Sequence, residues 1–145
     1  MKNKITAIFI IAIVAVMTTS CSDKPVPVTE VPAACQTFVN QYFPSKAISY
    51  AEKDLSWFSY KYEVTLADGT HVEFDTDNVW HKIESPMMGV PVAAMPAPVT
   101  TYLNTSHPGI QVKKIEKERY GYDVELINEI ELKLNEQGVL MEMDD

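Results

Sequence analysis

A few side chains in this sequence have the type and spacing needed to bind a metal. His71 and Glu73 lie two residues apart, which places them on one face if the segment is a strand, and His81 lies on the expected neighbouring strand. Two histidines and a carboxylate could hold zinc. Histidines are common on exposed strand faces and nothing in the sequence fixes the geometry of these three, so we predict no metal site and no cofactor.

The acidic run at residues 75–78 begins like a calcium-binding loop. Val79 stands where such a loop needs its third ligand, and Pro86 stands where it needs a bidentate glutamate. We therefore expect this run to be a turn.

Nucleophilic catalysis needs a serine or cysteine beside a positioned base. No serine lies in a glycine-rich elbow, and Cys35 has no histidine near it in the sequence. Cys35 falls on the apolar stripe of an expected helix, which favours a buried and unreactive thiol. A pair of carboxylates acting as acid and base stays open because acids are numerous. On balance the sequence indicates that the protein is not an enzyme.

The N-terminus has the layout of a secretory signal peptide. Lys2 and Lys4 precede an apolar run at residues 5–17, and small residues lead to Cys21. The run is too short to span a bilayer, which needs about 20 apolar residues. We interpret residues 1–20 as a signal peptide.

Cys21 resembles the lipidated cysteine of bacterial lipoproteins, in which an acyl group anchors the new N-terminus to a membrane. Residues 21–25 would then form a tether, and the protein would face the periplasm or the cell surface. Simple secretion without a lipid is the alternative.

The charge balance excludes some classes of partner. Twelve lysines and arginines face 20 acids, and the net charge is −8. Removing residues 1–20 deletes two lysines and no acid, which makes the mature chain more acidic. This argues against nucleic acid and against electrostatic adhesion to anionic lipid, so a lipid anchor would be the only membrane contact. The acids are spread along the chain, which indicates a solvated surface, although a basic partner stays possible.

Internal repetition is the most informative feature of the sequence. An offset of 64 residues places Val26, Pro27 and Val28 on Val90, Pro91 and Val92, and an offset of 60 later places Tyr62, Val64 and Leu66 on Tyr122, Val124 and Leu126. We therefore predict two copies of one unit, at residues 26–89 and 90–145.

Each copy reads as a short helix followed by four antiparallel strands. Apolar residues first recur at helical spacing and then alternate at strand spacing. The alternation predicts that Tyr60, Tyr62, Val64 and Leu66 face inward, and likewise Tyr120, Tyr122, Val124 and Leu126. Asp68-Gly69 predicts a hairpin turn, and Asn128-Glu129 predicts a weaker one. The fold class is α+β: two tandem α-β-β-β-β units, one continuous or paired antiparallel sheet, and both helices on one face.

These positions carry a family resemblance. The residues that carry it are Val31-Pro32-Ala33-Ala34, Phe43-Pro44, Tyr50-Ala51-Glu52-Lys53, Tyr62-Glu63-Val64, Leu66, Asp68-Gly69, Glu73-Phe74-Asp75 and Trp80. They resemble the PepSY-like, beta-lactamase-inhibitor-like family of bacterial secreted proteins across the whole mature chain. The resemblance implies tandem helix-plus-sheet units and an extracytoplasmic binding or inhibitory role, without naming a target.

An apolar insertion supplies the candidate partner-binding residues. Copy one has four more residues than copy two in the loop between its first two strands, where Leu55, Trp57 and Phe58 lie. Aromatic residues are frequent anchors of protein interfaces. Phe58 keeps the inward parity of Tyr60, which favours a core role, so Trp57 is the best single candidate. We predict a non-catalytic lipoprotein that binds a protein or peptide, with inhibition as one form of that role. The alternative is a structural or envelope-associated protein.

Overall fold

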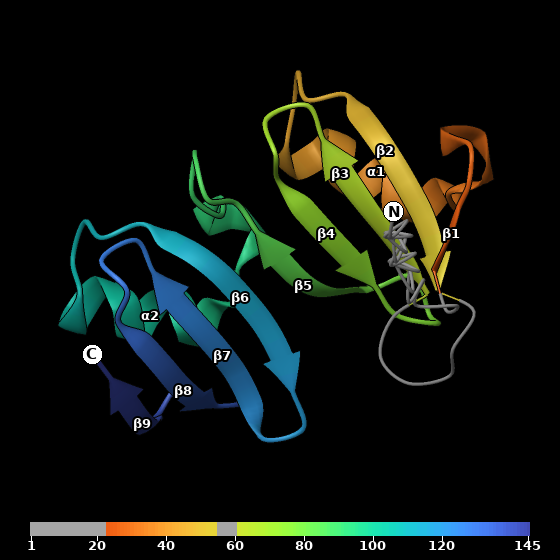
Figure 1. Cartoon of the computed structure of the whole chain (residues 1–145). Coiled ribbons are helices and arrows are strands. Elements are labelled where there is room, and N and C mark those ends of the chain that lie inside the picture. The colour runs from red at the N-terminus through yellow and green to blue at the C-terminus, as the bar shows by residue number, and fades with distance from the viewer. Residues whose placement is uncertain (1–22, 55–60) are drawn as a thin grey trace, which may run out of the picture.

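The computed structural model describes residues 23–54 and 61–145. Within them, one antiparallel sheet contains nine strands in the order of the sequence, so that each strand pairs with the one before it (Figure 1). The strands are β1 (Asp23–Pro25), β2 (Ile48–Asp54), β3 (Tyr62–Leu66), β4 (His71–Phe74), β5 (Trp80–Glu84), β6 (Val112–Glu118), β7 (Gly121–Leu126), β8 (Glu131–Asn135) and β9 (Leu140–Asp144). The expected α+β class and continuous antiparallel sheet are confirmed.

Two helices, α1 (Ala33–Tyr42) and α2 (Ala97–Ser106), lie on the same side of the sheet (Figure 1). Each follows a short 3-10 turn, η1 (Val28–Glu30) or η2 (Val92–Ala94). Pro32 and Pro96 stand at the two N-caps, where a residue without an N–H leaves no intrahelical bond unmade. Among the described residues, no helix is long and apolar enough to cross a membrane.

The core lies between the sheet and the helices. Strand register aligns one row of buried side chains across seven strands: Ala51, Val64, Val72, Ile83, Ile115, Val124 and Leu132. Cys35 and Val39 of α1 and Val99 and Leu103 of α2 are buried in the same hydrophobic cluster. One core therefore joins the two repeats. It is formed by the alternation of apolar and polar residues that strand geometry requires.

The repeats agree in detail. The β-bulge at Glu73/Phe74 recurs at Lys133/Leu134, and the irregularity between Ile48 and Tyr50 recurs between Val112 and Lys114. The offsets of 60 and 64 residues found in the sequence therefore describe equivalent positions of the fold.

Corresponding turns are equivalent as well. The β3–β4 turn and its counterpart, the β7–β8 turn, each have a positive φ at the third loop residue, 83° at Gly69 and 69° at Glu129. Each of these residues donates its N–H to the carbonyl of the last strand residue, at 3.0 Å. Both predicted hairpins are thus present.

Two details differ from the expectations. Tyr120 was predicted to point inward, and this is wrong: β7 begins at Gly121, so Tyr120 lies in the two-residue turn after β6, is 37% exposed and donates its hydroxyl to Asp123. In addition, residues 23–25 form β1, which pairs with β2, within a segment whose sequence carries no strand signal.

Candidate functional site: an open charged sheet face

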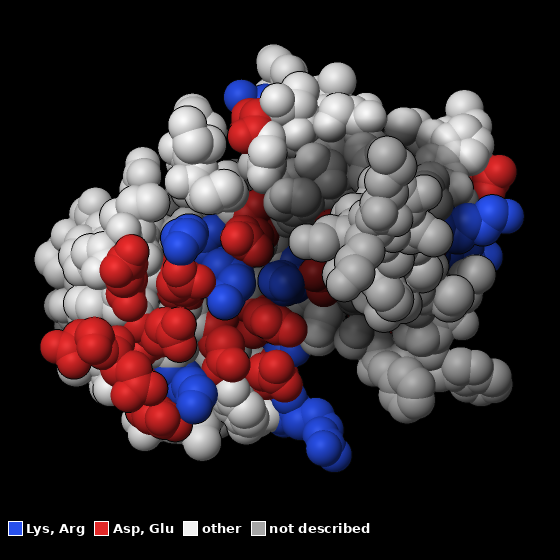
Figure 2. Space-filling model, viewed as in Figure 1, with Lys and Arg blue, Asp and Glu red and all other residues white. Residues whose placement is uncertain are grey.

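The face of the sheet opposite the helices is covered by no other described element and carries charged side chains (Figures 1 and 2). Strand register aligns them in two rows. The first row crosses eight strands: Glu52, Glu63, Glu73, Lys82, Glu116, Asp123, Lys133 and Glu142. The second row runs beside it: Tyr50, Thr65, His71, Glu84, Lys114, Glu125, Glu131 and Asp144. We call these two rows the charged face.

Acids outnumber bases on the charged face. The first row has six carboxylates and two lysines. Figure 2 shows the acidic side chains gathered over the strands of the second repeat, with lysines between them. The face is therefore a fixed, mainly negative surface on a rigid sheet.

Bulges bring extra basic side chains to this face. At the irregular step in β5, His81 and Lys82 both reach it: His81 Nε2 lies 3.5 Å from Glu116 Oε1 and Lys82 Nζ lies 3.0 Å from Glu73 Oε1. A bulge lets two consecutive residues oppose one on the next strand, which is how neighbours in sequence come to share a face.

The irregular step in β6 has the same effect. Lys113 and Lys114 both contact the Glu125 carboxylate, at 2.5 and 3.2 Å. Hydrogen bonding to Lys113 and the charge of both lysines hold the pKa of Glu125 below its usual value. Glu125 thus stays ionised, as a paired carboxylate.

Glu63 has the opposite environment. Desolvation and the facing carboxylates of Glu73 and Glu52 raise its pKa, and the hydrogen bond from His71, at 3.2 Å, offsets only part of that rise. Like charges on adjacent strands disfavour the ionised form of each other. This stretch of the face has a surplus of negative charge that a cationic partner would neutralise.

The three residues weighed as zinc ligands do not converge. His71 faces Glu63 and Thr65, Glu73 holds Lys82, and His81 faces Glu116. Among the described residues, no three His, Cys, Asp or Glu side chains are placed to hold a metal ion.

The run at residues 75–78 is a turn, as expected. The Asp75 carboxylate accepts hydrogen bonds from the backbone N–H groups of Asp77 and Val79, at 2.9 and 3.0 Å. Asn135 accepts the same two bonds in the second repeat. Both side chains cap a turn.

Cys35 is fully buried on α1, as its place in the helical pattern predicts. Burial raises the pKa of its thiol to about 11. The thiolate is the reactive form of cysteine, and burial together with the raised pKa disfavours it, so Cys35 is an unreactive residue of the core.

The candidate partner residues Leu55, Trp57 and Phe58, and the predicted lipidation site Cys21, lie outside the described residues. Their roles remain predictions. The alternation that places Tyr62, Val64, Tyr122, Val124 and Leu126 inward predicts that the residues between them point outward, and Glu63, Asp123 and Glu125 do so. Sequence reasoning missed Glu52, Lys82, Glu116 and Glu142, whose positions follow from the register of strand pairing and from the bulges.

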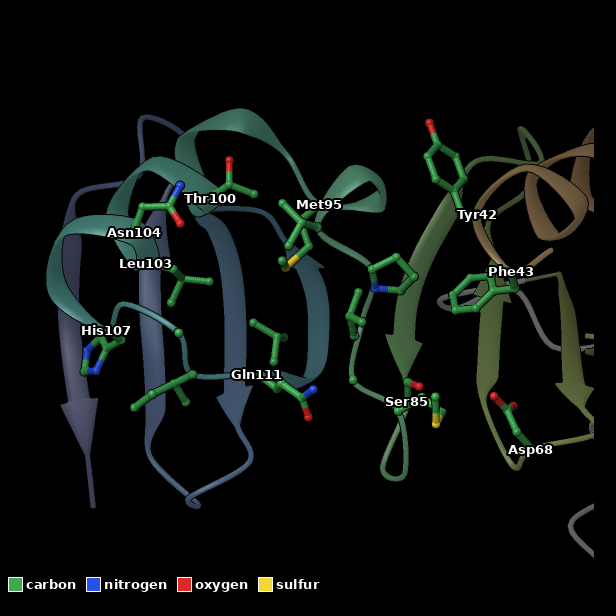
Figure 3. A pocket seen from close by; sticks show the side chains of 18 of the residues that line it. Tyr42, Phe43, Asp68, Ser85, Met95, Thr100, Leu103, Asn104, His107 and Gln111 are labelled. Atoms are coloured by element: carbon green, nitrogen blue, oxygen red, sulfur yellow. The ribbon is translucent and has the colours of Figure 1, made fainter.

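A groove of about 500 Å³ lies on the helix side, where the two repeats meet (Figure 3). Tyr42 and Phe43 at the end of α1 line one wall, and Leu103 and Asn104 of α2 line the other. At its margin, Lys46 Nζ lies 3.4 Å from the Asp68 carboxylate. Ser85, which lines it, is hydrogen-bonded to Thr70 at 3.0 Å, and most of the other lining residues are apolar, so the groove is a mostly apolar recess.

The fold and this face define a class: a tandem-repeat α+β protein whose antiparallel sheet has one charged side that no other described element covers. The family model described as "Putative beta-lactamase-inhibitor-like, PepSY-like" matches residues 16–60 and 60–142. The chain belongs to this family, which confirms the resemblance found in the sequence.

Solved structures of similar proteins come from Bacteroides. A "putative periplasmic protein" from Bacteroides vulgatus is 31% identical with a TM-score of 0.80, covering 87% of this chain and 99% of its own. A "putative calcium-regulated periplasmic protein" from Bacteroides thetaiotaomicron is 37% identical with a TM-score of 0.77, covering 85% and 97%. A second Bacteroides vulgatus protein, described as periplasmic and of unknown function, is 26% identical with a TM-score of 0.77. Comparison with curated proteins found no match. These relatives support an extracytoplasmic location.

Proposed function

We propose that this protein is a non-catalytic, extracytoplasmic binding protein that holds a polypeptide partner with a basic surface against its charged face. The observation that carries the proposal is the first row, in which six strands contribute a carboxylate and two contribute a lysine, on a side of the sheet that no other described element covers. Inhibition of the partner is one form this binding could take, as the family description suggests.

A rigid sheet is a suitable support for such a surface. The charged side chains stand on strands whose opposite side is packed in the core, so a partner meets positions that need no reordering on binding. Complementary charge mainly speeds association and selects the partner, and its effect weakens as salt screens it. Binding through this face should therefore be strongly salt-dependent.

Membrane anchoring completes the proposal. Acylation of Cys21 would hold the binding domain at a membrane surface, where the partner would be another envelope or secreted protein. Mass spectrometry of the N-terminal peptide from native membranes tests this part separately, and an unmodified Cys21 would remove it.

The test of the binding proposal is a capture experiment with two charge-matched variants. One carries Glu52→Gln, Glu116→Gln and Asp123→Asn on the charged face. The other carries Glu30→Gln, Asp77→Asn and Glu136→Gln, which remove the same charge from a 3-10 turn and two hairpin turns away from that face. Each immobilised protein is exposed to envelope extract, and captured proteins are identified by mass spectrometry.

We expect the wild type and the second variant to capture the same basic protein and the first variant to lose it. Calorimetry with the purified partner should then show affinity that falls as salt rises. Because one relative is described as calcium-regulated, the titration is run with calcium and with chelator. Equal capture by both variants would refute the role of the charged face, and capture of nothing by the wild type would favour the structural alternative.

A further inference from the structure

The two edges of the sheet differ. Strand β1 has only three residues, one of them Pro25, which has no N–H to donate. Strand β9 has five residues, and its apolar side chains are exposed: Leu140 at 38%, Met141 at 59% and Met143 at 53%. An edge strand with free backbone groups and exposed apolar side chains can pair with another extended chain. Among the described residues, no strand lies beyond β9 in the sheet.

The first repeat contains a strand in the same position, β5. The pairing of β8 with β9 repeats that of β4 with β5, bulge included, so that Leu140 corresponds to Trp80, Glu142 to Lys82 and Met143 to Ile83. On its other side β5 pairs with β6. Strand β6 therefore serves as a model for a strand that would pair with the equivalent, unpaired side of β9.

The exposed fractions of equivalent side chains on β5 and β9 show the effect of pairing with β6. Ile83 is 0% exposed and pairs with Ile115 of β6, whereas Met143 ends the same buried row of the sheet at 53%. Trp80 is 8% exposed, with Lys117 of β6 lying 4.0 Å from the centre of its ring. Leu140 and Met143 thus lack the cover that β6 gives to their counterparts Trp80 and Ile83 on β5.

A neighbouring position provides an internal control. Val79 is 47% exposed although β6 covers β5, and its counterpart Val139 is 58% exposed. The added strand therefore does not reach this position in the first repeat. We expect the same in the second.

The charged side chains of β9 indicate which residues a strand paired with it should have. Lys82 lies between Glu73, at 3.0 Å, and Glu116, its partner on β6. In the second repeat the charges are reversed, because Lys133 on β8 pairs with Glu142 on β9 at 2.8 Å. The residue of a covering strand that faces Glu142 should therefore be a cation. One step further, Glu84 pairs with Lys114, and its counterpart Asp144 calls for a second cation. Opposite charges on facing strands stabilise a pair and like charges destabilise it.

We propose that the β9 edge binds an extended peptide segment of another protein as a tenth, antiparallel strand, with an apolar residue opposite Met143 between two basic residues opposite Glu142 and Asp144. Two copies of this chain pairing through β9 would bring these acids near one another, so a second copy is the wrong occupant. The proposal does not depend on the binding function assigned to the charged face. Glu142 and Asp144 belong to that face too, but Met143 belongs to the buried row on the other side of the sheet, so its variant tests the edge alone.

The test uses two synthetic seven-residue peptides derived from β6. One has the native sequence VKKIEKE, which presents glutamate to Glu142 in the β5–β6 register. The other carries Glu116→Lys and presents lysine. Fluorescence anisotropy measures the binding of each labelled peptide to the purified protein, and hydrogen exchange locates it.

We expect the lysine peptide to bind at least about fivefold more tightly than the native peptide and to protect the amides of β9. Glu142→Lys should reverse this preference. Met143→Asp should weaken binding of both peptides, whereas Val139→Asp should leave it unchanged. Retention of the native fold in each variant is checked by circular dichroism.

Equal affinity for the two peptides, no binding of either, or an unchanged preference in Glu142→Lys would overturn the proposal. Protection of β9 that rises with protein concentration in the absence of peptide would show that a second copy occupies the edge, and would overturn it as well. Because Glu52, Glu116 and Asp123 are untouched in these proteins, failure here is distinct from failure of the charged face.

Discussion

Glu129 is a position where one substitution should stabilise the fold. It occupies the left-handed region at φ 69°, in the turn whose first copy has Gly69 at φ 83°. A residue with a side chain is strained in this region and glycine is not. Glu129 is exposed, and its backbone bond to the Leu126 carbonyl is the same length as the corresponding bond of Gly69. Glu129→Gly should therefore remove strain without removing a contact.

The magnitude follows from two opposing effects. The left-handed conformation costs about 1–2 kcal/mol for a residue with a Cβ. Glycine loses more freedom on folding than other residues, which costs roughly 0.5–1 kcal/mol. The net expectation is an increase of about 0.5–1 kcal/mol in the free energy of unfolding, or about 1–4 °C in melting temperature for a chain of this size.

Thermal and urea denaturation followed by circular dichroism measure this change. Glu129→Ala is the control, since it removes the same charge but keeps a Cβ, and it should not stabilise the protein. A melting temperature for Glu129→Gly at or below that of the wild type would refute the argument. An equal gain in Glu129→Ala would assign the effect to charge instead of to the backbone.

Three further predictions concern ionisable groups. Because folding raises the pKa of Glu63, its ionisation weakens the fold as pH rises above its ordinary value of 4.5, so Glu63→Gln should gain stability relative to wild type between about pH 4 and pH 7. Because folding lowers the pKa of Glu125, its ionised form stabilises the fold above the ordinary value of 4.5, and this stabilisation is lost as pH falls. Glu125→Gln should therefore lose stability relative to the wild type between about pH 4 and pH 7. If the free energy of unfolding, measured by urea titration, changed with pH in the same way in the wild type and in both variants, both assignments would be contradicted. Cys35 should react with a maleimide in denaturant and stay unlabelled in the folded protein, as measured by mass spectrometry, and rapid labelling of the folded protein would show that the thiol is accessible.

The elements of the fold were predictable where a local pattern fixes them. Val64 and Leu66 had to face the core because strand alternation leaves them no other side, and their counterparts Val124 and Leu126 repeat the argument. Tyr120 shows the limit of that reasoning. It continues the alternation in sequence, but the short connection after β6 uses it in the turn, and the length of a turn is decided by which residues of two strands pair.

The candidate site was predictable only in part, for the same reason. The outward direction of Glu63 and Asp123 follows from their own strands. Their membership of one row follows from the pairing of strands that are far apart in sequence, such as β5 with β6. Bulges then add His81 and Lys113 to the face, and a bulge leaves no signal in a binary pattern of apolar and polar residues.

The order of strands in the sheet has a consequence for how the chain reaches its fold. Every strand from β2 to β9 pairs with the strand immediately before it, so most contacts of the sheet join residues near in sequence. Low contact order shortens the search for the native state, and we expect this protein to fold quickly for one with so much sheet. A chain that emerges from an export pore N-terminus first could add one hairpin after another to a growing edge. The slowest step of such sequential pairing would be the addition of β6, because residues 85–111, which include α2, separate it from β5.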